Sequence, residues 1–288
     1  MHPLQRIPKF LRRHSLIRTL CRLGIIRNLV KGVYNENSHA FFNLLDPEPR
    51  NIFLKKSFEP DFFYLSKAFL RKNGIFFDLG ANHGFCTFGL LHERPNAKFH
   101  LFEANVEIAK IKRKSITLNM PISAELKCAC IAEEEGKSSF VVVPNQTGQS
   151  HVASIDEKGN SVPNIVLDQY CKVNEVGLVD FVKIDIEGHE LPALKGWTEF
   201  LSEHRAKAIY IEIMPENQAR YGLPTNAPLD FLEGLGYKLF LCKEDDFGSF
   251  GNAPSLDYGI ESKVPLSFFK AENYPEDFAT DVLALAPN

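Results

Sequence analysis

Three short stretches of the 288-residue chain place acidic side chains at the predicted ends of strands. In the first, Asp78 precedes a loop that contains Gly80, Ala81, Asn82 and Gly84. The glycines permit a tight turn and a close approach of the backbone to a ligand, and the helix that follows offers free N–H groups. A carboxylate before such a loop attracts an ammonium or a sulfonium. The pattern predicts a ligand with a positively charged group, and a purely structural turn is the alternative.

The second stretch, Glu103-Ala104-Asn105, follows the next predicted strand along the chain. An acid at this position can accept both hydroxyls of a ribose. The alternative role of Asn105 is to cap the helix that follows. A third predicted strand ends at Cys130 and Ile131, whose apolar and backbone surface would border an adenine. We therefore expect a nucleoside-containing cofactor at these strand ends.

The third stretch groups four ionisable side chains around a glycine at the end of another predicted strand: Asp185, Glu187, His189 and Glu190. Such a group is more typical of an acid and base site than of a solvated face. Glu212, the acid of a later apolar strand, is expected at the same edge. A pairing of Lys183 with Asp185 is the structural alternative. Asp185, Glu187 and His189 could also hold a divalent ion, but this ligand set is not diagnostic, and we predict no metal.

These stretches lie in a chain that alternates between strand-like and helix-like periods. Apolar runs predict five strands, and amphipathic runs between them predict helices, an order typical of a parallel sheet covered on both faces. The expected strands are residues 75–80, 98–103, 124–131, 181–185 and 208–213, with two closing strands at 237–242 and 282–286. Ligands bind at the carboxyl ends of such strands. The three acidic stretches should therefore meet at one edge.

Composition and charge exclude several classes of protein. With 44% hydrophobic residues and a net charge of −3, the chain is neither disordered nor collagen-like. It lacks the run of about 18 apolar residues that a membrane span needs. The six cysteines include no C-x-x-C pair, which indicates a reducing compartment. We therefore predict a cytoplasmic protein.

The first 35 residues carry eight basic and no acidic side chains, whereas the rest of the chain is acidic. We predict a basic helical N-terminal extension at residues 1–58 and a catalytic domain at residues 59–288, with an insert at about residues 138–166. Apolar residues spaced among the basic ones suggest an amphipathic helix within residues 5–32. This helix could pack on the acidic body or make a peripheral contact with the inner membrane surface.

Three runs resemble, in this order, the signature segments of the FkbM-type methyltransferases: FFDLGANHGFCT, FHLFEAN and FVKIDIEGHELPALKG. The similarity spans about residues 74–212, and the K-I-D-x-E-G-x-E pattern of the third run is its most specific part. The resemblance implies an α/β, Rossmann-like class I methyltransferase fold with a seven-stranded, mostly parallel sheet, one reversed strand and helices on both faces. It also implies S-adenosylmethionine as the methyl donor and a hydroxyl oxygen as the usual acceptor.

Residue by residue, the resemblance places Asp78, Gly80, Asn82 and Gly84 around the methionine part of the donor and Glu103 at its ribose. It places the segment with Asp185, Glu187 and His189 where the donor methyl meets the acceptor. The insert replaces the least constant part of the family, so the identity of the acceptor stays open.

We predict O-methylation of a saccharide or another small-molecule or glycan acceptor, with His189 or Asp185 as the base. The alternative is a non-catalytic Rossmann-like protein that binds a glycan or a protein partner. Acids at both Asp78 and Glu103 argue against it, because a binder needs no cofactor pocket. A nicotinamide-dependent oxidoreductase is disfavoured by Asn82 at the middle glycine position of G-x-G-x-x-G. No nucleic-acid partner is expected, since the body of the chain is acidic.

Overall fold

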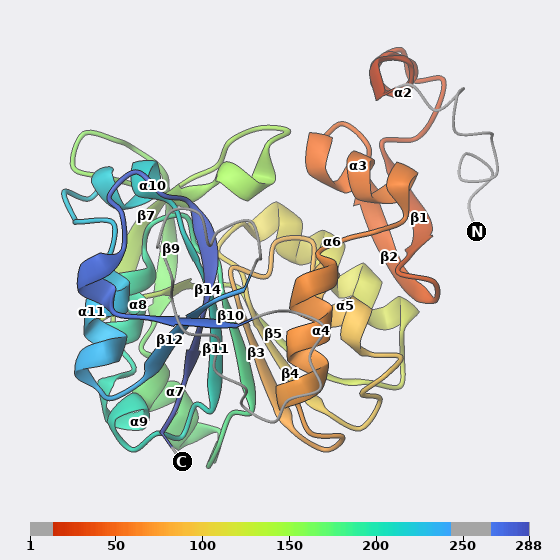
Figure 1. Ribbon diagram of the computed structural model, residues 1–288. Coiled ribbons are helices and arrows are strands. Elements are labelled where there is room, and N and C mark those ends of the chain that lie inside the picture. The colour runs from red at the N-terminus through yellow and green to blue at the C-terminus, as the bar shows by residue number, and fades with distance from the viewer. Residues whose placement is uncertain (1–13, 243–265, 288) are drawn as a thin grey trace.

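The computed structural model describes residues 14–242 and 266–287, and its centre is an eight-stranded mixed sheet (Figure 1). In spatial order the strands are β13 (Ser267–Phe269), β12 (Lys238–Leu241), β14 (Thr280–Leu285), β11 (Ala208–Ile213), β10 (Phe181–Ile184), β3 (Ile75–Leu79), β4 (Lys98–Phe102) and β5 (Ser123–Lys127). The strands from β11 to β5 are parallel, and β14 is antiparallel to both of its neighbours. The predicted mostly parallel sheet is confirmed, with β14 as its reversed strand, and β13, which is antiparallel to β12, adds an eighth strand at the edge.

Helices cover both faces of the sheet because its central strands are apolar on both sides. In β3, Phe76 belongs to the apolar cluster of one face and Phe77 to that of the other. The first face is covered by α4 (Pro60–Phe69), α5 (Phe85–Leu90) and α6 (Val106–Leu118). The second is covered by α7 (Leu167–Val173), α8 (Glu190–Lys195), α9 (Thr198–Ser202) and α11 (Ala227–Gly234). Two short helices, α10 (Pro215–Ala219) and η4 (Ala271–Asn273), complete the connections.

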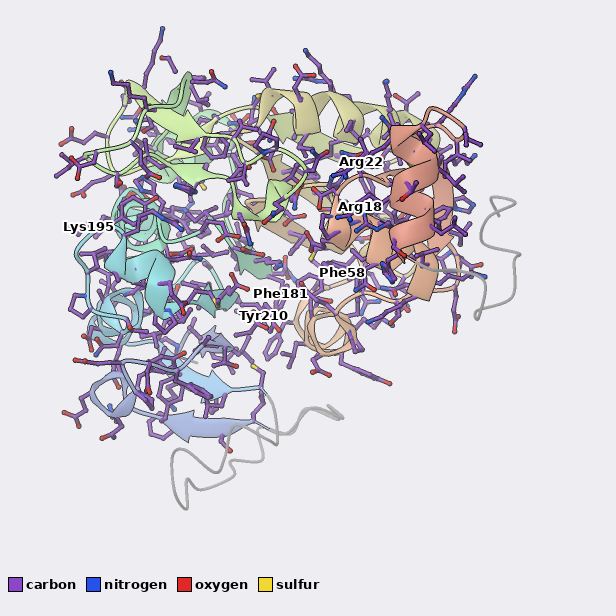
Figure 2. All side chains as sticks on the ribbon, turned by 90° about the horizontal axis from the view of Figure 1, so that it is seen from above. Arg18, Arg22, Phe58, Phe181, Lys195 and Tyr210 are labelled. Carbon is purple, nitrogen blue, oxygen red and sulfur yellow. The ribbon has the colours of Figure 1, made fainter. Side chains whose placement is uncertain are left out.

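Aromatic rings hold the first helical layer on the sheet. Phe62 of α4 lies 5.8 Å from Phe181 and 5.6 Å from Tyr210, measured between ring centroids. Figure 2 shows Phe181 and Tyr210 in the interior of the molecule. Burial of large aromatic side chains is among the strongest contributions to core stability. This layer therefore fixes the position of the segment that leads into α4.

The N-terminal extension is only partly helical, which corrects the prediction for residues 1–58. Two helices, α2 (His14–Arg22) and α3 (Pro47–Lys55), flank a hairpin of β1 (Leu29–Tyr34) and β2 (Ser38–Asn43). Buried residues alternate with less buried ones along both strands, as the period of two of a half-buried strand requires. The reversal is made by Asn35 and Glu36, which both adopt positive φ angles. Residues 5–13 of the predicted amphipathic helix lie outside the described residues.

The extension shares its apolar cluster with the catalytic domain. The ring of Phe42 stacks on Phe85 of α5 at a centroid distance of 5.1 Å. The hydroxyl of Tyr34 donates a hydrogen bond to the backbone oxygen of Phe85. On α2, Ile17 and Cys21 are buried, while Arg18 and Arg22 are exposed (Figure 2). One face of α2 therefore packs on the body of the protein, which is one of the two arrangements considered for this helix.

The insert forms a small sheet of its own. Its strands, in spatial order, are β6 (Cys130–Ile131), β9 (Asn160–Ile165), β7 (Lys137–Val141) and β8 (His151–Val152), with the short helix η2 (Thr147–Gln149) before β8. The prediction of one strand at residues 124–131 is therefore wrong. The segment forms two strands, because β5 ends at Lys127 and β6 belongs to the small sheet. The insert also begins earlier than residue 138. Within the described ranges, no helix has the length and apolar character needed to cross a bilayer.

We expect Phe42→Ala to lower the free energy of unfolding of the whole protein by about 3–5 kcal/mol, because it empties a fully buried site in the shared cluster. Urea denaturation followed by the fluorescence of Trp197 measures this, since Trp197 is the only tryptophan and packs on the opposite face of the sheet. The control is Leu23→Ala, at an exposed position, which should change stability by less than about 0.5 kcal/mol. An unchanged Trp197 transition in Phe42→Ala would show that the extension unfolds independently.

Candidate functional site

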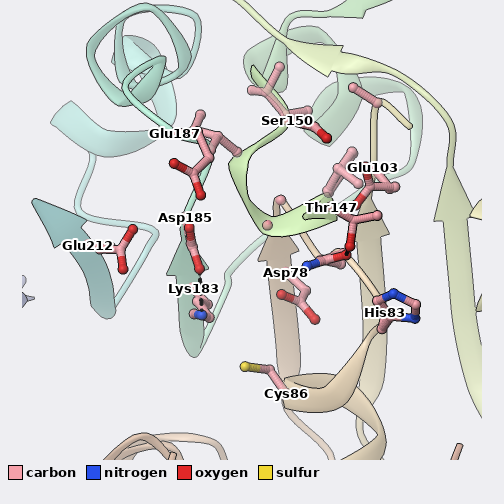
Figure 3. A pocket seen from close by; sticks show the side chains of 18 of the residues that line it. Asp78, His83, Cys86, Glu103, Thr147, Ser150, Lys183, Asp185, Glu187 and Glu212 are labelled. Carbon is pink, nitrogen blue, oxygen red and sulfur yellow. Dashed lines mark hydrogen bonds and ion pairs between the residues drawn. The ribbon is translucent and has the colours of Figure 1, made fainter. Parts of the chain in front are cut away.

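A cavity of about 290 Å³ opens at the carboxyl ends of β3, β4, β10 and β11 (Figure 3). The walls contain nearly all of the residues that the sequence predicted for the site: Asp78, Gly80, Ala81, Asn82, Glu103, Ala104, Cys130, Ile131, Asp185, Glu187, His189 and Glu212. Gly84 and Asn105 are not among them. The strand ends therefore bring the three acidic stretches together.

The loop after β3 presses directly against the end of β10. Gly80 has a φ of 79°, and a Cβ atom built there would lie 1.8 Å from the backbone oxygen of Asp185. The N–H groups of Gly80 and Ala81 both donate to the oxygen of Phe102 at the end of β4. Only glycine fits this position, because any side chain would overlap the neighbouring backbone. The loop is thus held between two strand ends and forms the floor of the cavity.

Gly84 and Asn105 do not border the cavity, and both have local structural roles. Gly84, with a φ of 81°, precedes α5, and a Cβ there would lie 2.6 Å from the ring of Phe88. Asn105 caps α6, where its side-chain oxygen accepts hydrogen bonds from the N–H groups of Glu107 and Ile108. The capping alternative considered for Asn105 is therefore the arrangement found.

The carboxylates on one side of the cavity are deeply buried. Asp78 is 1% exposed and accepts a hydrogen bond of 2.6 Å from the hydroxyl of Thr87. Burial raises the pKa of Asp78, and the bond from Thr87 opposes that change. Glu103 is 7% exposed and accepts a hydrogen bond from the N–H of Asn105 through Oε1, while its Oε2 lies 3.6 Å from Nζ of Lys112. Lys112 is fully buried on α6 and compensates the charge of Glu103.

A buried lysine anchors the carboxylate of Asp185 on the other side. Nζ of Lys183 lies 2.9 Å from Oδ2 of Asp185 and 3.4 Å from Oε1 of Glu59. Burial alone would lower the pKa of Lys183, but the negative charge of Asp185 and other nearby acids outweighs it and raises that pKa well above its ordinary value. The pairing considered as a structural alternative is present. Asp185 nevertheless faces the cavity, so the pair belongs to the site.

Asp185 lies next to two further carboxyl groups, Glu187 and Glu212 (Figure 3). One oxygen from each of the three falls within 4.8 Å of the others. Burial, followed by the charge of Asp185, raises the pKa of Glu187 to about 8. The charge of Asp185, followed by burial, raises the pKa of Glu212 to about 10. Both groups therefore retain a proton at neutral pH.

His189 and Glu190 complete the third predicted stretch in different ways. The ring of His189 borders the cavity, and its Nδ1 has no hydrogen-bond partner in the part of the chain that the structure describes. Burial lowers the pKa of His189 to about 4, so the ring is neutral at pH 7. Glu190 instead accepts hydrogen bonds from the N–H groups of Ile186 and Gly188. Glu190 therefore shapes the loop and does not border the cavity.

Sequence reasoning missed cavity residues from the extension and the insert. Glu48 of α3 accepts a hydrogen bond of 3.3 Å from the amide of Asn82, and Thr147 of η2 donates one of 3.1 Å to the same side chain. Thr147 also donates two hydrogen bonds to Asp46. Glu48 and Glu59 lie outside every recognisable motif. A helical wheel of α6 would have placed Lys112 on the buried face with Ile108 and Ser115, and this signal was available.

The fold and this cavity define a Rossmann-like methyltransferase, and a comparison with protein families identifies the branch. The model of the methyltransferase FkbM domain matches residues 78–239, more than half of the chain. The chain belongs to the FkbM methyltransferase family. S-adenosylmethionine is accordingly its methyl donor, which confirms the predicted family and cofactor and sets aside the nicotinamide alternative.

Solved structures show only a remote likeness. A precorrin-6y C5,15-methyltransferase from Geobacter metallireducens is 13% identical, with 79% of this chain and 87% of that chain covered and a TM-score of 0.41. An rRNA methylase from Streptococcus thermophilus is 12% identical, with coverages of 78% and 94% and a TM-score of 0.40. A SAM-dependent methyltransferase from Aquifex aeolicus is 13% identical, with coverages of 84% and 94% and a TM-score of 0.38. A search of curated proteins finds no match.

The residues present fit this donor. The close passage of Gly80 over Asp185 leaves the loop as bare backbone, which a ligand can approach closely. The carboxylates of Asp78 and Glu103 suit the cationic groups and the ribose hydroxyls of S-adenosylmethionine. Phe102, Ile131 and Phe140 supply an apolar wall beside Glu103. The cavity thus combines the polar and apolar surfaces that a charged nucleoside requires.

The raised pKa of Glu187 predicts a stability that falls as pH rises from about 4.5 to about 8, because the unfolded chain releases this proton first and the folded chain still holds it. Glu187→Gln should flatten the dependence of stability on pH. At pH 8 its free energy of unfolding should exceed that of the native protein by roughly 1–3 kcal/mol, since a tenfold change in proton affinity corresponds to about 1.4 kcal/mol. Urea denaturation at a series of pH values measures it. The exposed control Glu133→Gln should keep the native slope, and identical slopes in all three proteins would contradict the expectation.

Proposed function

We propose that the protein transfers the methyl group of S-adenosylmethionine to a hydroxyl oxygen of a saccharide or another small-molecule or glycan acceptor. One observation carries this proposal. Asp78 and Glu103 line the same cavity as Asp185, Glu187 and Glu212. We assign the donor to the part around the first two residues, the donor half, and the acceptor to the part around the other three, the acceptor half. The ends of β3 and β4 contribute the donor half, and the ends of β10 and β11 contribute the acceptor half. The two reactants would therefore meet above Gly80.

In the donor half, we assign the methionine part to the loop of Asp78, Gly80, Ala81 and Asn82. The ribose hydroxyls are assigned to Glu103, because the N–H of Asn105 holds its Oε1 and its side chain lines the cavity. The adenine is assigned to the neighbouring part of the cavity wall, which is formed by Ala104, Cys130 and Ile131. Lys112 keeps Glu103 in place by its charge.

When bound, the donor supplies an electrophilic methyl group on a sulfonium. The chain must hold the acceptor oxygen in line with that group, and positioning of this kind supplies much of the rate of bimolecular reactions. We assign the base to Asp185, whose carboxylate is anchored by Lys183 at 2.9 Å. It would take the proton of the acceptor hydroxyl, because Glu187 and Glu212 already hold protons at neutral pH. His189 is the rival base, since its ring is neutral and borders the same cavity.

Location and further contacts are also part of the proposal. We place the protein in the cytoplasm, and we assign a peripheral contact with an anionic membrane surface to residues 5–32. In the described part of that segment, the apolar side chains of Leu16, Leu23 and Ile25 are exposed. The basic side chains of Arg18 and Arg22 on α2 are exposed as well. Apolar and basic residues together favour binding at a membrane interface. A nucleic-acid acceptor is not proposed, because the cavity is lined by acids.

For the donor half, we expect Glu103→Gln to weaken binding of S-adenosylmethionine by about 10- to 100-fold, since a hydrogen bond to a charged group contributes about 1.5–3 kcal/mol. Isothermal titration calorimetry measures the dissociation constant. The matched control is Glu107→Gln on α6, whose side chain is 75% exposed and should leave binding unchanged. Equal affinities of native protein and Glu103→Gln would refute the ribose assignment, and saturable binding of NAD(H) would contradict the donor.

For the acceptor half, we expect Asp185→Asn to lower kcat by about 10²- to 10⁴-fold with little change in donor affinity, the range typical of a general base. Release of S-adenosylhomocysteine in the presence of a panel of saccharide acceptors measures the rate. Mass spectrometry of the product locates the methyl group on oxygen. Asp156→Asn, at an exposed position of the insert, is the control. Full activity in Asp185→Asn with loss in His189→Ala would transfer the role to His189, and product methylated on carbon or nitrogen alone would contradict O-methylation.

A further inference from the structure

The two halves of the cavity differ in their balance of charge. In the donor half, Asp78 and Glu103 face the buried cation Lys112, and the donor itself brings a net positive charge from its sulfonium, ammonium and carboxylate groups. The donor half is therefore close to neutral once the donor is bound. Any excess of charge that remains belongs to the acceptor half.

The acceptor half keeps an excess of acids over cations. Its carboxyl groups are those of Glu48, Glu59, Asp185, Glu187 and Glu212, and the cation among the described residues that line it is Lys183. Lys183 is already shared by Asp185 and Glu59, at 2.9 and 3.4 Å. Another acid, Asp281, stands opposite Glu212 in the register of β14 against β11 and adds to its repulsion. Among the described residues, neither Glu187 nor Glu212 forms an ion pair, and the nearby charges of Arg220 and Lys183 offset the repulsion only in part.

The carboxyl group of Glu187 is held in place and does not simply extend into solvent. Its backbone has a positive φ of 57°, and its Oε2 accepts a hydrogen bond of 2.7 Å from the amide of Asn217. Arg220 donates to the backbone oxygen of Glu187 at 2.8 Å. Gly188 packs so closely on Asn217 that a Cβ there would lie 2.3 Å from the oxygen of Asn217. The loop therefore holds Glu187 towards the cavity, beside Glu212 and Asp185.

We propose that the acceptor carries a protonated amine next to the hydroxyl that receives the methyl group, as in an amino sugar or an amino alcohol. This inference rests on the proposed methyl transfer. The ammonium group occupies the space between Glu187 and Glu212, and the neighbouring hydroxyl lies at Asp185. Acceptors whose corresponding substituent is a phosphate or a carboxylate are rejected, because they would place a like charge among buried acids.

The protonation of Glu187 and Glu212 agrees with an ammonium group between them. Burial and the charge of Asp185 raise the pKa of Glu187, and the charge of Asp185 and burial raise that of Glu212, so both retain protons at neutral pH although Arg220 and Lys183 oppose the shifts. An ammonium placed between them would favour their charged forms, so its binding should release protons. A neutral sugar brings no charge and should release none.

The test is calorimetric titration of the protein loaded with S-adenosylhomocysteine, using glucosamine, glucose and glucuronate as probes at pH 7. We expect glucosamine to bind at least tenfold more tightly than glucose and glucuronate to bind most weakly. Titrations in two buffers of different ionisation enthalpy should show proton release with glucosamine alone. Glu212→Gln should remove most of the preference and most of the proton release, and Glu187→Gln provides a second, independent variant. The exposed control Glu133→Gln should retain both.

Equal binding of glucosamine and glucose, or binding of neither by a sample that is saturated with S-adenosylhomocysteine, would overturn the proposal. Magnesium ion is the remaining source of positive charge, since carboxylate oxygens also bind it. Saturable binding of Mg²⁺ that excludes glucosamine would overturn the proposal in favour of a metal. Failure to bind S-adenosylhomocysteine would instead count against the donor half, and so the proposed function and the acceptor class fail in different ways.

Discussion

The loop after β3 and the end of β10 approach each other so closely that no side chain fits between them. A Cβ at Gly80 would lie 1.8 Å from the backbone oxygen of Asp185, and the N–H of Asp185 donates to the oxygen of Leu79 at 3.1 Å. This contact places the proposed donor half of the cavity directly beside the proposed acceptor half. The parallel pairing of β3 with β10 enforces it, because parallel neighbours end at the same edge of a sheet. A larger residue at position 80 would separate the halves that methyl transfer has to join.

A second constraint follows from the burial of Lys183 in the central strand β10. A buried ammonium needs compensating charge, and Asp185 and Glu59 provide it. Asp185 directly follows β10, and its pair with Lys183 is drawn in Figure 3. Glu59 comes from the segment that leads into α4. The ion pairs thus connect the catalytic strand to the end of the extension. They also keep one carboxylate of the acceptor half in a defined position.

The extension and the insert enclose the cavity from two sides and meet above the glycine loop. Asp46 and Glu48 come from the extension, Thr147 from the insert and Asn82 from the loop, and hydrogen bonds join all four. Asn82 can occupy this position because asparagine tolerates the positive φ of 38° found there. Its side chain then reaches both covering segments. Asn82, which stands where a dinucleotide-binding motif has glycine, therefore connects the loop, the extension and the insert.

Much of the fold and most of the site could be predicted from the sequence, because both depend on local patterns. Apolar runs identified the strands, and acids directly after β3, β4 and β10 identified the strand ends that a parallel sheet brings together. Local patterns could not reveal the hairpin of the extension, the separation of β6 from β5, or which acid Lys112 and which cation Glu59 would pair with. Those features depend on contacts between segments distant in the chain. Cavity charge is likewise a tertiary property, since the solvation and pairing of each acid depend on what packs around it.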